Sequence, residues 1–133
     1  MIDYRTSHDL DFEQLAALFR TAGWGYRADD PAMLAAMVSG AKYVVSAHDS
    51  DQGGRLVGFA RAISDGVTNA YVGSVAVLPE YRGRGIGSEV VRRLMEGRDK
   101  VRFVLHARKA MHPFYRKLGF DDAVDLLVRD RKA

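Results

Sequence analysis

The six residues Arg82-Gly83-Arg84-Gly85-Ile86-Gly87 lie between two segments of different hydrophobic periodicity, and this junction decides the fold class. The run before it, residues 71–78, is apolar like a strand, whereas residues 88–96 have the apolar spacing of a helix. Glycines let the backbone curl so that successive N–H groups point into one concavity. The start of the helix adds the positive end of its dipole. The junction therefore predicts an anion cradle that suits a phosphate or pyrophosphate.

A plain glycine-rich turn is the competing interpretation, and two standard nucleotide-binding motifs are excluded. The chain has no Gly-x-x-x-x-Gly-Lys-Ser/Thr pattern, which a P-loop requires. It also has no Gly-x-Gly-x-x-Gly fingerprint, because the glycines of the junction are spaced by two and Ser88 stands at the third required position. The cradle is therefore neither a P-loop nor a dinucleotide-binding turn.

Length and composition limit the classes of protein to which the chain can belong. A chain of 133 residues, 47% of them hydrophobic and 28% charged, predicts one ordinary globular domain over residues 1–133. No apolar run approaches the ~20 residues of a membrane span. Residues 1–5 do not resemble a signal peptide, so we expect a cytoplasmic protein with no membrane partner.

Charge and residue types narrow the chemistry further. The absence of cysteine excludes disulfides, thiolate metal sites and cysteine nucleophiles. A net charge of +3 suits a polyanionic small molecule but is too small to indicate a nucleic-acid partner. The 4 histidines are dispersed along the chain, so no metal site is expected.

Short apolar runs and helical spacings alternate along the chain in an order typical of a mixed α/β sheet. The predicted strands are 2–5, 42–48, 55–63, 68–78, 101–105 and 125–128. The predicted helices are 11–22, 30–39, 88–96 and 111–118. Asp11 with Gln14 is typical of a capping box, and Asp30 before Pro31 of a capped helix start. We expect helices on both faces of the sheet and the cradle beyond the carboxyl end of a strand, where ligands bind in open sheets.

A second motif further along the chain accompanies the cradle. Residues Phe114-Tyr115-Arg116-Lys117-Leu118-Gly119-Phe120 end a predicted short helix, and Arg82-x-x-Gly85-x-Gly87 follows an apolar strand. With the order of elements, these motifs resemble the GCN5-related N-acetyltransferase (GNAT) superfamily, in particular its small single-domain bacterial members. The resemblance covers essentially the whole chain. It implies a GNAT fold, with a central, mostly antiparallel sheet that contains one parallel, splayed pair of strands.

The resemblance also implies acetyl-CoA as the acetyl donor. Backbone amides of the cradle would hold its pyrophosphate, and the strand edge just before the cradle would pair with the pantetheine arm like an added strand. An amide of Ala76 or Val77 would polarise the thioester carbonyl. The cofactor-binding residues implied in this way are Val75, Ala76, Val77, Arg82, Gly83, Arg84, Gly85, Ile86, Gly87 and Ser88.

Tyr115 is implied as the catalytic acid that protonates the thiolate of coenzyme A as it leaves. A phenol is neutral at pH 7 and can donate a proton to a forming thiolate. The competing interpretation is an amphipathic core aromatic, as expected of Phe114 and Phe120. The base is left open, because Gly73-Ser74 stands where relatives of this small type often carry an acidic residue. The alternatives for the base are Glu80, Asp65, His112 or a chain of water molecules.

These features predict an acetyl-CoA-dependent N-acetyltransferase that acts on a primary amine of a small molecule by direct attack. Trp24, Tyr26 and Phe59 are predicted to line the acceptor site, although Trp24 equally suits a plug between two helices. One alternative is an acyl-CoA-binding regulatory module without turnover. Another is an acetyltransferase that acts on a protein or a tRNA. Dimerisation is common in such folds, so a homodimer is a further expectation.

Overall fold

A five-stranded sheet in the order β1-β2-β3-β4-β5 organises the molecule, whose computed structural model describes residues 1–132. The strands are β1 (Ile2–Arg5), β2 (Tyr43–Asp49), β3 (Arg55–Ser64), β4 (Asn69–Val77) and β5 (Arg102–Leu105). Neighbouring strands are antiparallel except for the parallel pair of β4 and β5. This mixed sheet confirms the predicted fold class.

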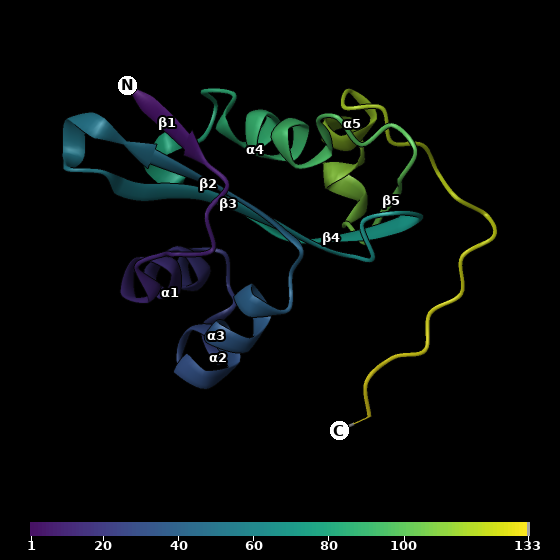
Figure 1. The fold of residues 1–133 in the computed structure, drawn as a ribbon, viewed down its shortest axis with the longest axis horizontal. Helices are drawn as coiled ribbons and strands as arrows, with labels where there is room; N and C mark the ends of the chain where they lie inside the picture. The colour runs from purple at the N-terminus through teal and green to yellow at the C-terminus, as the bar shows by residue number, and fades with distance from the viewer. Residues whose placement is uncertain (133) are drawn as a thin grey trace.

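Helices cover both faces of the sheet, as predicted. Figure 1 shows α1, α2 and α3 on one face and α4 and α5 on the other. The helices are α1 (Phe12–Thr21), α2 (Gly25–Ala28), α3 (Pro31–Ser39), α4 (Ile86–Met95) and α5 (His112–Arg116). Single 3-10 turns are η1 (Ser50–Gln52), η2 (Pro79–Tyr81) and η3 (Lys109–Met111).

Side-chain caps begin the first and third helices where the sequence places them. Asp11 accepts hydrogen bonds from the first-turn amides of α1, and Asp30 accepts one from the Met33 amide in α3. The second half of the predicted capping box differs. Gln14 donates to the Asp11 carboxylate at 3.2 Å, and its Oε1 accepts the Leu56 amide of β3 at 2.7 Å. Gln14 therefore joins α1 to the sheet in addition to supporting the cap.

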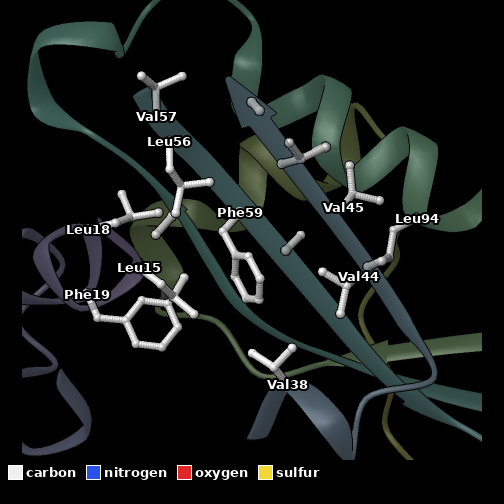
Figure 2. Close-up of a cluster of buried hydrophobic side chains, with 14 of the residues drawn as sticks. Leu15, Leu18, Phe19, Val38, Val44, Val45, Leu56, Val57, Phe59 and Leu94 are labelled. Carbon is white, nitrogen blue, oxygen red and sulfur yellow. The ribbon is translucent and has the colours of Figure 1, made fainter. Parts of the chain in front are cut away.

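The hydrophobic core lies mainly between α1 and the sheet and between α4 and the sheet. Figure 2 shows Leu15, Leu18 and Phe19 of α1 directed toward Phe59 of β3. The rings of Phe19 and Phe59 meet edge to face with centroids 5.8 Å apart. On the other face, α4 buries an apolar stripe that ends at Leu94. These two layers hold β3 and β4 in place as the platform of the site described below.

The prediction of a last strand at 125–128 is wrong. The structure has no strand there, and the chain after α5 runs away from the sheet (Figure 1). Val124 is 100% exposed and Leu127 99% exposed, so these apolar side chains have no packing partner within residues 1–132. An apolar run becomes a strand only where a neighbouring strand supplies N–H and C=O groups. Asp125 makes a single contact of 3.5 Å with Arg102 at the beginning of β5.

None of the helices in the described part of the chain is both long enough and apolar enough to cross a bilayer.

Candidate active site

The cradle, residues 82–88, has the open backbone that its glycines predict. Gly83 has φ 79° and Gly85 φ 81°, in the left-handed region that glycine adopts without strain. Gly85 is the N-cap residue of α4, and no side chain caps this helix, in contrast to α1 and α3. The first-turn N–H groups of α4 are therefore left for a bound anion.

Two contacts fix the cradle against the sheet. Gly58 of β3 lets Ile86 approach closely, because a Cβ atom on Gly58 would lie 2.9 Å from Ile86 Cγ2. Before the cradle, the Tyr81 hydroxyl donates a hydrogen bond of 2.6 Å to the carboxylate of Asp49 at the end of β2. Both side chains of this second contact are buried. The cradle thus lies on a rigid base, although residues 82–85 at its start are exposed.

We expect Tyr81→Phe to lower the thermal midpoint at pH 7 by about 4 °C, because it removes this buried hydrogen bond. The Tyr81 hydroxyl holds the pKa of Asp49 below its ordinary 3.8. Because the pKa of Asp49 is lower in the folded state, its carboxylate stabilises the fold at pH values above its unfolded-state pKa. This stabilisation is lost as the pH falls through the folded-state pKa. Thermal unfolding followed between pH 3 and 7 should therefore show the difference narrowing at the acid end. Equal midpoints at pH 7 would contradict the structural role.

Backbone carbonyls of β4 and η2 hold the two arginines of the cradle. Arg82 Nε donates to the carbonyl of Val77 at 3.2 Å, and Arg84 Nη2 donates to the carbonyl of Glu80 at 3.3 Å. The Arg84 guanidinium also lies 4.8 Å from the centroid of the Tyr81 ring. Their side chains therefore add positive charge beside the loop without a carboxylate partner among residues 1–132. Ser88 lies half-buried in the first turn of α4.

The edge of β4 before the cradle is free on the β5 side. The two parallel strands pair only from Asn69 with Arg102 to Val72 with Leu105. Beyond Val72, the residues of β4 have no partner in β5, although Ala76 still pairs with Phe59 of β3. The strands therefore separate at the positions where the sequence predicts an added, strand-like ligand. Val75 and Val77 lie half-buried on this segment, and Ala76 is buried.

Tyr115 is held by one aromatic neighbour on α5 and one just after it. Its ring lies edge to face against Phe114, with centroids 4.9 Å apart, and against Phe120, with centroids 5.7 Å apart. Burial raises the pKa of the Tyr115 hydroxyl above its ordinary value of 10.0, which keeps the phenol protonated at neutral pH. The neighbouring Phe114 lies next to the cradle, because a Cβ atom on Gly87 would lie 3.4 Å from Phe114 Cζ. The structure thus links α5 and the cradle through Phe114.

A hollow of about 1310 Å³ lies beside this tyrosine. Its walls come from β5, from α5 and from the chain that follows α5. Tyr115 and Leu105 are among the lining residues, so the hollow reaches the strand from which β4 separates.

The three aromatic residues predicted for the acceptor site lie in different surroundings. Tyr26 is 61% exposed on α2, and Trp24 is half-buried against Phe19, with ring centroids 5.3 Å apart. This contact agrees with a plug between helices. Phe59 is 0% exposed and belongs to the core under α1, which does not favour contact with an acceptor.

Two arginines that the sequence analysis does not single out lie at the same part of the sheet. Arg27 of α2 and Arg61 of β3 both direct a donor toward the hydroxyl of Ser74 in β4. The signal that could have found them is Arg61 itself, a charged residue within the apolar run of β3. Arg27 carries no such signal, because a charged residue is ordinary in the loop predicted between the first two helices.

The candidate bases differ in what their side chains already do. Asp65 accepts hydrogen bonds from Val67 and Thr68 in the turn between β3 and β4, and these bonds hold its pKa far below the ordinary value. β4 extends on the order of 25 Å from that turn to the cradle, at 3.3 Å per residue. Glu80 lies next to the cradle and pairs with Arg55 at 3.4 Å. His112 Nε2 lies 3.1 Å from the carbonyl of Ala107. Geometry therefore disfavours Asp65.

The fold and these motifs match one protein family. The model of the acetyltransferase (GNAT) domain matches residues 39–122, which include β2 to β5, the cradle and α5. The chain belongs to this family, as the sequence predicts.

Particular relatives support the same conclusion. The chain is 33% identical to the histone acetyltransferase TAP1 of Glycine max, covering 90% of this chain and 56% of that protein. It is 35% identical to the chloroplastic serotonin N-acetyltransferase 2 of Oryza sativa, covering 87% and 59%. The chain thus spans little more than half the length of these curated relatives.

Solved structures share the fold over nearly their entire length. A probable acetyltransferase from meticillin-resistant Staphylococcus aureus superimposes with a TM-score of 0.83 at 24% identity, covering 100% of both chains. A GNAT-family acetyltransferase from Streptococcus pneumoniae gives a TM-score of 0.77 at 24% identity, covering 99% and 100%. At this identity, the likeness concerns the fold.

Proposed function

We propose that the chain transfers the acetyl group of acetyl-CoA to a primary amine by direct attack. The observation that carries this proposal is the placement of an uncapped helix start beside a freed strand edge. A pyrophosphate fits the first feature, because backbone N–H groups and a helix dipole favour an anion there. An extended pantetheine amide chain fits the second, because a free strand edge offers unpaired N–H and C=O groups.

The donor is a substrate whose thioester supplies an activated acyl group. The amides around Ala76 and Val77 polarise its carbonyl, and the residues from Arg82 to Ser88 hold its pyrophosphate. The chain contributes position above all, since it aligns two bound reactants. A C–N bond forms between the amine and the acetyl carbon while the C–S bond breaks. Tyr115 gives its proton to the departing sulfur and regains one from water.

The amine must lose a proton, and the side chains of β4 offer no carboxylate for this step. Ser74 lies near the centre of β4, and its hydroxyl oxygen accepts hydrogen bonds from Arg27 and Arg61. We propose that the proton leaves through a chain of water molecules. Glu80 and His112 are the side-chain alternatives that geometry permits.

The acceptor is proposed to be a small-molecule amine. The exposed ring of Tyr26 on α2, which directly follows Trp24, supports this choice, because aromatic rings can line a compact binding site. The curated relatives carry names of both kinds, one for serotonin and one for a histone. A protein or tRNA acceptor is thus the alternative that the acceptor test must include. A cytoplasmic location and a homodimer stay predictions.

Calorimetric titration with acetyl-CoA, followed by measurement of thiol release on adding amines, tests this function. The chain contains 0 cysteines, so a thiol reagent reports only coenzyme A and has no protein background. We expect binding in the micromolar range and amine-dependent thiol release. Binding without release to any amine, peptide or tRNA would support the acyl-CoA-binding module instead. No binding at all would leave the cradle as a plain turn.

A further inference from the structure

Two arginine side chains from distant parts of the chain converge on one hydroxyl. Arg27 Nη1 lies 3.4 Å from Ser74 Oγ, and Arg61 Nε lies 3.1 Å from the same atom. Arg27 comes from α2, Arg61 from β3 and Ser74 from β4. Three elements therefore bring two positive charges to one point on the sheet. We refer to Arg27 and Arg61 together as the arginine pair.

The charge of the arginine pair has no carboxylate partner. Within residues 1–132, neither side chain lies within 4.0 Å of an Asp or Glu oxygen, whereas Arg20 of the neighbouring α1 pairs with Asp29 at 3.0 Å. Both members of the pair are half-buried. Two guanidinium groups held this close repel one another, and burial together with the charge of Arg27 lowers the pKa of Arg61. An anion between them would relieve this repulsion.

Aromatic rings hold Arg27 in position, and its one side-chain hydrogen bond within residues 1–132 is the contact of Nη1 with Ser74. Its guanidinium carbon lies 5.3 Å from the centroid of the Trp24 ring and 5.1 Å from that of Tyr26. Stacking on aromatic faces orients an arginine without using its N–H groups. A planar guanidinium with free N–H groups is suited to bidentate binding of a carboxylate or phosphate.

The backbone under the arginine pair is strained. Ser74 has φ 56°, the sole residue other than glycine with a positive φ in the described chain. It lies where the register between β3 and β4 shifts, between the pairing of Phe59 with Ala76 and that of Arg61 with Gly73. Left-handed residues of this type persist where a site requires them. Ser74 directly precedes Val75, the start of the strand segment assigned above to the acetyl donor.

We propose that the arginine pair binds an anionic group of the acceptor, so that the preferred substrate is a primary amine that also carries a carboxylate or a phosphate. That the bound anion belongs to the acetyl acceptor rests on the proposed function. The anion-binding site itself rests on the contacts described above. The anion would lie beside Ser74, and the amine would point along β4 toward the freed strand edge.

Paired probes that differ only in the anion test this inference by calorimetry, with and without saturating coenzyme A. β-Alanine is compared with β-alaninamide for a carboxylate, and 2-aminoethyl phosphate with ethanolamine for a phosphate. The variants are Arg27→Gln and Arg61→Gln, with Arg20→Gln as the matched control that removes a nearby positive charge outside the pair. Because Arg61 packs 3.4 Å from the Cβ position of Gly73 and can support the fold, Arg27→Gln gives an independent reading.

We expect the anionic member of at least one pair to bind about tenfold more tightly or better. Each variant of the arginine pair should reduce that preference about tenfold, and Arg20→Gln should retain it. The pair that shows the preference identifies the anion as carboxylate or phosphate. Equal affinities within both pairs, no binding of any anionic probe, or a preference that survives Arg27→Gln would each overturn the inference.

The same titrations separate this inference from the proposed function. If acetyl-CoA does not bind but an anionic amine does, the arginine pair stands and the acetyltransferase proposal fails. A different result would be equal thiol release with all amines, with the ratio of kcat/KM for the anionic probe to kcat/KM for its partner without the anion unchanged in both variants. In that case the acetyltransferase proposal stands and the inference about the arginine pair fails.

Discussion

Gly85→Asp is expected to lower the affinity for acetyl-CoA at least 100-fold while the protein remains folded. The space around a Cβ atom at Gly85 is open, and its φ of 81° costs an aspartate about 1 kcal/mol. The new carboxylate would lie over the N–H groups at the start of α4, where it would repel the pyrophosphate and compete for the same donors. Calorimetric titration with acetyl-CoA measures the effect.

Gly97→Asp is the matched control for this experiment. Gly97 has φ 73° and open space around its Cβ position, and it lies at the other end of α4. The control therefore adds the same charge and the same backbone strain away from the cradle. We expect its affinity to stay within a factor of two of the wild type. Similar losses in both variants, or wild-type affinity in Gly85→Asp, would show that the cradle does not hold the pyrophosphate.

Tyr115→Phe is expected to lower kcat about 100-fold with little change in the dissociation constant for acetyl-CoA. The ring contacts with Phe114 and Phe120 remain in the variant, so only the proton donor is lost. Burial raises the pKa of Tyr115 above its ordinary value, so the wild-type phenol is protonated at neutral pH. Loss of the acid through ionisation should therefore not limit kcat around neutral pH. Thiol release under saturating acetyl-CoA measures the change.

Tyr43→Phe provides the control for loss of a hydroxyl. Tyr43 is also half-buried, and its ring lies 3.7 Å from the guanidinium carbon of Arg98, away from α5. We expect its kcat to match the wild type. An unchanged kcat in Tyr115→Phe would assign Tyr115 to the core and leave protonation of the thiolate to water. A lower thermal midpoint in Tyr115→Phe alone would likewise point to a structural role.

Features set by residues close together in the sequence were predictable. The start of α3 at Pro31 follows from Asp30, whose carboxylate accepts the Met33 amide at 3.1 Å. The left-handed glycines of the cradle follow from their spacing, because few other residues adopt such φ values. The fold class follows from the order of such local elements.

Features set by partners distant in the sequence were not predictable. Residues 125–128 have the apolar pattern of a strand, but a strand also needs a neighbour, and none pairs with them within residues 1–132. The convergence of Arg27 and Arg61 depends on the register shift between β3 and β4, which periodicity does not reveal. The sequence similarly allows Phe59 to line the acceptor site, whereas in the structure its side chain is buried against α1.

The lengths of the strands bear on how copies of the molecule behave in concentrated solution. The two outer strands, β1 and β5, have 4 residues each, whereas the inner strands have 7, 10 and 9. An outer strand presents unpaired N–H and C=O groups that can template sheet growth from one molecule to the next. Short outer strands limit that templating, and β5 begins with a charged Arg102. The sheet can therefore keep a freed edge for a ligand inside the molecule while its outer borders resist aggregation.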